Sequence, residues 1–163
     1  MTSIRLLPLS ALAFRPFGDV IEMGRHEPII INQGFAQRFN DLATVDVTAE
    51  GGRVNVSLVA AKPRPLPMDV RIMERHPLGT QIFYPLQDRP WTVVVCGDPR
   101  DHGSYRAFTA DGRQGINYAR NTWHHPLLAH DSENRFIIID RAGPGNNLDE
   151  FWLPDGAGLV LTR

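Results

Sequence analysis

Short apolar runs separated by turn residues recur along most of this chain. Runs of this length that are rich in Val, Ile, Phe and Trp are typical of β-strands. The predicted strands are residues 29–31, 54–60, 70–73, 81–86, 91–96, 105–109, 123–129 and 136–140. Gly and Pro favour the backbone angles of turns, and they gather between these runs. The clearest turns are Gly51-Gly52, Asp98-Pro99, Asp111-Gly112 and Gly143-Pro144-Gly145.

One short helix is indicated near the amino end. Ser10 can cap a helix over residues 11–15, and Pro16 and Gly18 would end it before an extended segment at 19–21. The helix signals then stop. We therefore expect an all-β fold with one short N-terminal helix, and eight short strands fit a double-sheet jelly roll with a ligand cavity between its sheets.

The run at residues 54–60 alternates between apolar and polar side chains. Val54, Val56 and Leu58 fall on one face, whereas Asn55 and Ser57 fall on the other. We expect one face of this strand to be apolar, the other mostly polar, and the strand to line a wet cavity.

The composition narrows the range of partners. The chain has 163 residues, 42% of them apolar, so we expect one domain over residues 1–163. Its 17 basic and 18 acidic residues nearly cancel, and no basic run appears. Neither nucleic acid nor an anionic membrane surface is therefore an expected partner, and a small neutral or acidic ligand remains.

Two residue types occur once. Cys96 lies in an apolar run and is interpreted as a small buried hydrophobic side chain rather than a nucleophile. Lys62 precedes a proline and is expected in an exposed loop, which leaves imine chemistry as a minor alternative. The Leu-Pro-Leu-Ser-Ala-Leu-Ala segment is broken by Pro8 and Ser10 and leads into a segment typical of folded chain. We therefore do not interpret it as a signal peptide, and we expect a cytoplasmic protein.

Two segments concentrate groups that bind ligands or transfer protons. The first contains Asn117, Tyr118, Arg120, His124 and His125. Histidine has an unperturbed pKa near neutrality, so these imidazoles can transfer protons or ligate a metal, although a packed structural role is the alternative for an isolated pair. The first segment is therefore interpreted as an active-site strand.

The second segment contains Glu74, Arg75, His76 and Gln81. In an extended strand Glu74 and His76 share a face and Arg75 points the other way. A kink at the following Pro and Gly would turn Gln81 toward the face of His76.

Five segments together resemble the ureidoglycolate lyase family. They are residues 14–22, 74–81, 115–118, 123–127 and 139–141, which read FRPFGDVIE, ERHPLGTQ, GINY, WHHPL and IDR. The resemblance implies a cupin-type double-stranded β-helix that forms a homodimer. It also implies an amidine-lyase reaction of allantoin and purine degradation, in which ureidoglycolate is split into glyoxylate and urea.

The general cupin metal pattern is incomplete here. It has His-x-His followed by Glu in one motif and His in a second, whereas this chain offers Glu-Arg-His, then Gln81, then His124. Two imidazoles with one Gln or Glu oxygen could still hold a divalent ion, with His76, Gln81 and His124 as the candidate set. Nickel is the ion that the resemblance implies.

Ureidoglycolate is a hemiaminal, so its elimination needs a base, an acid and a carboxylate-binding group. For proton transfer we favour His124 with His76, and Glu74 as orienting carboxylate or base. Tyr118 is a further candidate acid. Strand alternation predicts that His124 and His125 diverge, so His125 is a candidate for substrate binding, for structural support or for a dimer contact.

The remaining candidates would bind the two ends of the substrate. Arg75 and Arg120 are the candidates for the carboxylate, with a structural salt bridge as the alternative for Arg75. Gln81 and Asn117 would bind the urea group, as would Tyr118. Trp123 is expected as a cavity wall rather than a reacting group.

Two other functions stay open. A hydrolase would use an activated water to release ammonia and carbon dioxide together with glyoxylate. A non-catalytic cupin sensor would bind a small carboxylate with the same groups and would not consume it.

Overall fold

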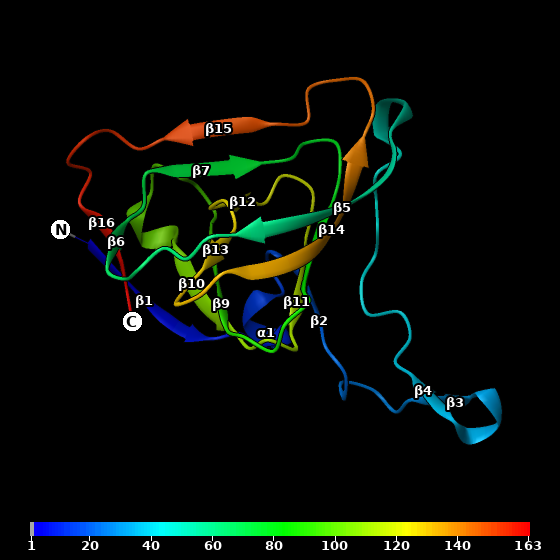
Figure 1. The fold of residues 1–163 in the computed structure, drawn as a ribbon. Coiled ribbons are helices and arrows are strands. Elements are labelled where there is room, and N and C mark those ends of the chain that lie inside the picture. The colour runs from blue at the N-terminus through cyan, green and yellow to red at the C-terminus, as the bar shows by residue number, and fades with distance from the viewer. Residues whose placement is uncertain (1) are drawn as a thin grey trace.

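The computed structural model of the protein describes residues 2–163, and most strands belong to two β-sheets that face each other across an apolar core (Figure 1). In order of pairing, the nine-stranded sheet contains β15 (Asp149–Trp152), β7 (Ile72–Arg75), β12 (Trp123–His124), β9 (Trp91–Cys96), β10 (Arg106–Ala110), β1 (Thr2–Pro8), β16 (Leu159–Thr162) and β6 (Met68–Asp69), with β13 (Leu128–Ala129) also paired to β9. The five-stranded sheet contains β2 (Gly18–Ile21), β11 (Gly115–Tyr118), β8 (Gln81–Pro85), β14 (Asn134–Ala142) and β5 (Arg53–Ala61). A separate hairpin contains β3 (Ile29–Ile31) and β4 (Ala36–Arg38).

The helical elements are few and short. They are α1 (Ala11–Phe14) and the 3-10 turns η1 (Asn32–Gly34), η2 (Ala49–Gly51) and η3 (His102–Ser104). The predicted N-terminal helix is confirmed as α1, which ends one residue earlier than expected, and the Ser10 hydroxyl accepts a hydrogen bond from the Ala13 N–H at 3.2 Å. Within residues 2–163, no helix has the length and apolar character needed to cross a membrane.

The predicted fold class, an all-β cupin-type barrel with one short N-terminal helix, is confirmed. Most neighbouring strands run antiparallel, and β1 is an exception because it lies parallel to both β10 and β16. The first strand of the chain is thereby held between a middle strand and the last one.

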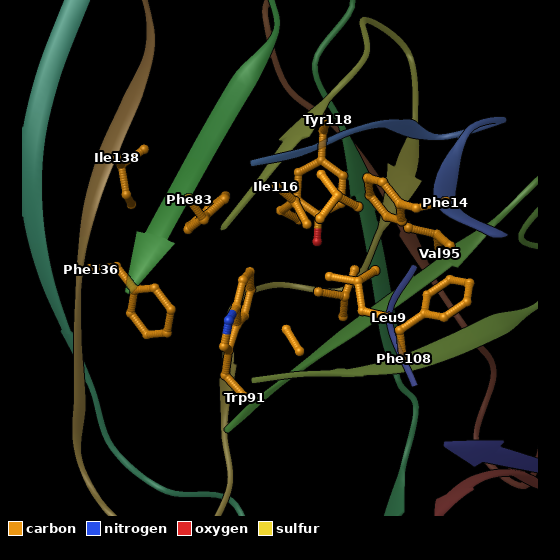
Figure 2. Close-up of a cluster of buried hydrophobic side chains, with 13 residues drawn as sticks. Leu9, Phe14, Phe83, Trp91, Val95, Phe108, Ile116, Tyr118, Phe136 and Ile138 are labelled. Carbon is orange, nitrogen blue, oxygen red and sulfur yellow. The ribbon is translucent and has the colours of Figure 1, made fainter. Parts of the chain in front are cut away.

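Apolar side chains from both sheets fill the space between them (Figure 2). Phe136 of the smaller sheet packs edge-on against Trp91 of the larger sheet, with ring centroids 5.0 Å apart. Phe14 of α1 contacts Phe108 in the same manner at 6.0 Å. Burial of such aromatic side chains is a main source of folding free energy, so this first cluster holds the two sheets together.

A second apolar cluster lies on the other face of the larger sheet. All six residues of β9 are buried, and successive side chains of a strand point to opposite faces. Val93 and Val95 therefore enter the first cluster, whereas Val94 and Cys96 enter the second. The interpretation of Cys96 as a buried hydrophobic side chain is confirmed, and burial raises the pKa of its thiol to about 12.

The predicted strands differ from the observed ones mainly at their ends. The run at 91–96 matches β9, and the run at 70–73 is shifted to Ile72–Arg75. The single strand predicted over residues 123–129 is wrong, because the chain forms two short strands, β12 and β13, on either side of Pro126. Proline has no N–H for a sheet ladder, which accounts for the interruption.

The alternation predicted for β5 is confirmed. Its apolar residues Val54, Val56 and Leu58 are more than half exposed on the outside of the barrel. Its polar residue Asn55 donates a hydrogen bond to Asp140 of β14. The polar face is therefore the inner one, and the apolar face is exposed to solvent.

Candidate active site

Three potential ligand groups meet inside the barrel: the Glu74 carboxylate and the imidazoles of His76 and His124. Glu74 of β7 and His124 of β12 are direct partners in the sheet, so their side chains share a face. His76 follows the end of β7 and lies on the side predicted from strand alternation. One ligand atom from each of the three residues lies within 4.8 Å of those of the other two.

Hydrogen bonds from the backbone fix the orientation of both imidazoles. The His76 Nδ1–H donates to the Asn147 carbonyl at 2.7 Å, and the His124 Nδ1–H donates to the Thr122 carbonyl at 2.9 Å. A carbonyl oxygen only accepts, so the proton of each neutral ring is on Nδ1 and the Nε2 atom carries a lone pair. Both Nε2 atoms are buried and have no hydrogen-bond partner among residues 2–163.

The electrostatics of the cluster favour a cation or a transferable proton. The His124 Nε2 lies 3.4 Å from a Glu74 oxygen. Burial alone would raise the pKa of Glu74, but the neighbouring His124, His76 and His125 outweigh it and hold that pKa below its ordinary value. An ionised carboxylate and two Nε2 lone pairs are thus directed at one point, and a carbonyl on each Nδ1 is the usual second partner of a metal-bound His. These residues fit a divalent metal ion.

Glu74 and Gln81, the two candidate sources of an oxygen ligand, lie on different sheets. Glu74 lies with His76 and His124, and Gln81 lies on β8 of the other sheet. The chain passes from one sheet to the other between His76 and Gln81. The predicted kink therefore reflects a crossing between sheets rather than a bulge within one strand.

A row of side chains continues from the cluster along the inner face of the smaller sheet. The Tyr118 ring stacks on the His124 ring, with centroids 4.0 Å apart and an interplanar angle of 15°. Gln81 is the direct partner of Tyr118 across β8 and β11. The Gln81 Nε2–H donates to Asp140 at 3.3 Å, and Asn55 donates to the same carboxylate at 2.9 Å. The Gln81 Oε1 is buried and has no partner among the described residues.

Tyr118 contacts the cluster with its ring rather than with its hydroxyl. Figure 2 shows the hydroxyl oxygen pointing among the apolar side chains of the first cluster, on the side of Trp91 and Leu9. Burial, and secondarily the charge of Glu74, raises the pKa of Tyr118 above its ordinary value. The phenol therefore stays protonated, and its flat face holds the His124 imidazole in place.

The two candidate arginines are both engaged with other groups. Arg75 lies on the opposite face of β7 from Glu74, where its Nε–H donates to Asp149 at 2.9 Å and its guanidinium lies 4.6 Å from the centre of the Trp123 ring. The alternative of a structural salt bridge for Arg75 is what the structure contains. Trp123 precedes His124 on β12 and packs against the second cluster, so it lies on the opposite face of the sheet from His124.

Arg120 contacts the segment that follows His76. Its Nε and Nη2 donate to the carbonyl of Pro77, the residue after His76, and its Nη1 lies 3.4 Å from Asp46. The backbone N–H of Asn121 donates to the His76 carbonyl at 3.0 Å. Arg120 therefore borders the segment that positions His76.

Asn117 and His125 do not belong to the cluster of Glu74, His76 and His124. Asn117 alternates with Tyr118 on β11 and donates to Asp19 at 3.1 Å and to the Thr44 carbonyl at 2.9 Å, on the other face of the sheet. The His125 Nδ1–H donates to the Pro126 carbonyl at 2.7 Å. Burial lowers the pKa of His125 to about 4, so this imidazole is neutral at physiological pH.

Sequence reasoning missed Asp140, Asn55 and Asn147 as parts of the site. Asp140 accepts hydrogen bonds from both Gln81 and Asn55, and Asn147 orients His76 through its carbonyl. Alternation along β14 was the available signal for Asp140, because Phe136 and Ile138 on the same face are core residues. Asn147 lies in a loop, and no periodic pattern could have identified it.

The fold and the cluster define a cupin-type barrel that holds one carboxylate and two imidazoles together in its interior. A family model described as "Ureidoglycolate lyase" matches residues 1–160. The chain belongs to the ureidoglycolate lyase family.

Relatives with this name cover nearly the whole chain. "Ureidoglycolate lyase 1" of Rhizobium meliloti (strain 1021) is 52% identical over 145 residues, which are 88% of this chain and 85% of the relative. "Ureidoglycolate lyase" of Burkholderia mallei (strain NCTC 10229) is 50% identical over 169 residues and covers 99% of both chains. The protein of the same name from Stutzerimonas stutzeri (strain A1501) is 42% identical and covers 99% of this chain and 96% of its own.

Solved structures give a more distant likeness. An oxalate decarboxylase from Lactobacillus farciminis in complex with formate matches with a TM-score of 0.42 and 13% identity, over 68% of this chain and 30% of that one. A Bacillus subtilis oxalate decarboxylase matches with a TM-score of 0.42 and 12% identity, over 67% of this chain and 27% of that one. The chain thus spans less than a third of the length of either structure.

Proposed function

We propose that this protein is a ureidoglycolate lyase of the amidine-lyase type, which eliminates urea from ureidoglycolate and releases glyoxylate during allantoin and purine degradation. The observation that carries the proposal is the convergence of the Glu74 carboxylate and the Nε2 atoms of His76 and His124. Relatives named for this reaction, at 42–52% identity over most of the chain, support it. The proposal takes residues 1–163 as one cytoplasmic domain that acts on a small molecule.

The reaction moves one proton from oxygen to nitrogen. A base removes the proton of the substrate hydroxyl, the electron pair of that O–H bond forms the carbonyl of glyoxylate, and the carbon–nitrogen bond breaks as the urea nitrogen is protonated. Glu74 is the ionised group of the cluster, so we assign to its carboxylate the removal of the hydroxyl proton and its delivery to the urea nitrogen.

The neighbouring residues would orient the substrate and the cluster. The buried Gln81 Oε1 lacks a partner among the described residues and would accept an N–H of the urea group. Tyr118 positions His124 by ring stacking. With Arg75 paired on the opposite face, Arg120 is the remaining candidate arginine for the substrate carboxylate.

One oxygen of Glu74 and the imidazoles of His76 and His124 would hold a divalent cation, which leaves the second Glu74 oxygen for proton transfer. Nickel is the ion we propose because the ureidoglycolate lyase family implies it, and imidazole nitrogen is one of its suitable ligands. The cation would supply Lewis-acid polarisation of a substrate oxygen. Metal analysis of protein purified without chelators tests the assignment, with Glu74→Gln as the variant expected to lose the ion.

The same three-residue set also favours a second candidate, hydrolysis of the ureido group by an activated water. One experiment separates the two reactions. Purified protein is mixed with racemic ureidoglycolate, and glyoxylate and ammonia are measured with and without added urease, after correction for spontaneous breakdown of the substrate.

Ammonia that appears only after urease identifies urea as the product and supports the lyase. Ammonia without urease identifies the hydrolase. Stoichiometric binding without enzyme-dependent glyoxylate would contradict both and favour a sensor. Glu74→Gln should lower kcat about 100-fold or more, the scale of general acid–base catalysis, whereas Glu133→Gln is a matched control because Glu133 is exposed on the surface.

We also propose a homodimer as the working assembly. The exposed apolar face of β5 supports this assembly.

A further inference from the structure

A hairpin projects from the barrel and carries an apolar surface with no core of its own. We call β3, η1, Phe35 and β4, residues 29–38, the arm. Figure 1 shows the arm extending away from both sheets, and β3 and β4 pair only with each other among the described strands. Ile29 and Ile30 are more than half exposed, Ile31 is 36% exposed and Phe35 is 90% exposed.

An isolated two-stranded hairpin of this kind is marginally stable in water. Three consecutive isoleucines and an exposed phenylalanine add to the free-energy cost of an uncovered arm, because each leaves apolar area in contact with solvent. Contiguous exposed apolar patches are typical of surfaces that bind another molecule. The arm therefore requires a partner surface.

A second unpartnered apolar surface lies on β5. This strand forms one edge of the five-stranded sheet, is nine residues long and contains no proline. Val54, Val56 and Leu58 lie on its outer face, and Leu58 is 73% exposed. A long apolar edge without proline is a site of uncontrolled pairing unless another chain segment covers it. The strand thus offers both unpaired backbone groups and an apolar face.

We propose that the arm of one copy covers β5 of a second copy, and that the exchange is reciprocal. Each chain carries one donor surface, the arm, and one acceptor surface, the free edge of β5 with its outer apolar face. A twofold axis would let each copy give one arm and receive one, which closes the assembly at two chains. The pairing would add a strand to an exposed sheet edge, a recurrent mode of recognition.

The exposed area matches what a stable dimer needs. Eight apolar side chains are involved, counting Met23 at the base of the arm, which is 67% exposed. At roughly 100 Å² of exposed apolar surface each, they contribute about 800 Å² per protomer, the share of one partner in an interface of standard size. No third protein is needed to cover either surface.

Substitution of one residue in each surface tests the proposal. Phe35→Asp and Leu58→Asp are compared with wild type by size-exclusion chromatography with light scattering, at fixed protein concentration. Wild type should be a dimer and both variants should be monomers that keep their circular dichroism. Leu12→Asp is the matched control, because Leu12 on α1 is 81% exposed and belongs to neither surface, and it should stay dimeric.

Cross-linking identifies the contact directly. The chain's single cysteine, Cys96, is buried, so introduced cysteines report alone. Phe35→Cys and Leu58→Cys are prepared separately, mixed, allowed to exchange and oxidised. A disulfide between residues 35 and 58, found only in the mixture, supports the exchange.

A monomeric wild type, or a dimer that survives both Asp substitutions, would overturn the proposal. So would a wild-type dimer whose mixed cysteine variants form no 35–58 disulfide. The oligomer measurements do not depend on turnover, so a failure of the lyase assignment and a failure of the arm exchange are distinguishable.

Discussion

Replacing His125 with Gln should make the fold less sensitive to acid. His125 is 3% exposed, and its Nδ1–H donates to the Pro126 carbonyl. Burial disfavours the charged imidazolium and lowers the pKa of His125 from 6.5 to about 4. Gln cannot be protonated in this range, and its amide N–H can donate to the same carbonyl.

The sign and size follow from the two pKa values. Below pH 6.5 His125 binds a proton in the unfolded chain but stays neutral in the folded chain. The free energy of unfolding therefore decreases as the pH falls. The decrease ends near pH 4, where the folded protein is protonated as well. The whole effect is about 3 kcal/mol, and about 2 kcal/mol of it falls between pH 7 and pH 5.

Urea denaturation at pH 7 and pH 5, with EDTA present and at one protein concentration, measures this difference. Wild type should lose about 2 kcal/mol more than His125→Gln between the two pH values. His26→Gln changes an exposed imidazole and should follow the wild type. Equal losses in wild type and His125→Gln would refute the reasoning, because His125 would then not be buried in its neutral form.

Three further results are expected. Tyr118→Phe should change kcat by less than about threefold and raise the free energy of unfolding by about 1 kcal/mol, because it removes a hydroxyl from apolar surroundings. A 100-fold loss in steady-state kcat would instead identify that hydroxyl as the catalytic acid. Arg75→Lys should leave KM unchanged because Arg75 is paired with Asp149, whereas Arg120→Lys should raise KM about tenfold because Arg120 is proposed to bind the substrate carboxylate. Equal KM values for the two variants in steady-state assays would contradict that role of Arg120. Nickel added to EDTA-treated protein at about 100 times its Kd should raise Tm by about 5–10 °C in a thermal melt. The same increase in Tm for Glu74→Gln as for wild type would show that the ion binds elsewhere.

Local patterns were sufficient for the strands of the core and for part of the site. The run at 91–96 was predicted because six consecutive apolar or β-branched residues are typical of a strand buried on both faces. Alternation also placed Glu74 and His76 on one face and Arg75 on the other, as the structure shows. In each case neighbouring residues alone determine which face a side chain occupies.

Long-range register could not be predicted in this way. The pairing of Glu74 with His124 depends on which strands become neighbours, and their sequences do not encode that choice locally. The strand β15 was missed because it begins with Asp149 and Glu150, and carboxylates are depleted in strands. Its Asp149 is instead stabilised by Arg75 of the adjacent strand, a contact made only in the folded protein.

The position of β1 has a consequence for how the chain matures. Because β1 lies between β10 and β16, Ile4 shares the second cluster with Leu159 and Leu161. During synthesis β1 cannot pair with β16 until almost the entire polypeptide has left the ribosome, because β16 is the last strand to be made. Barrel closure is therefore a late event that depends on contacts between distant residues, which slows folding and leaves apolar surface open to chaperones in the meantime.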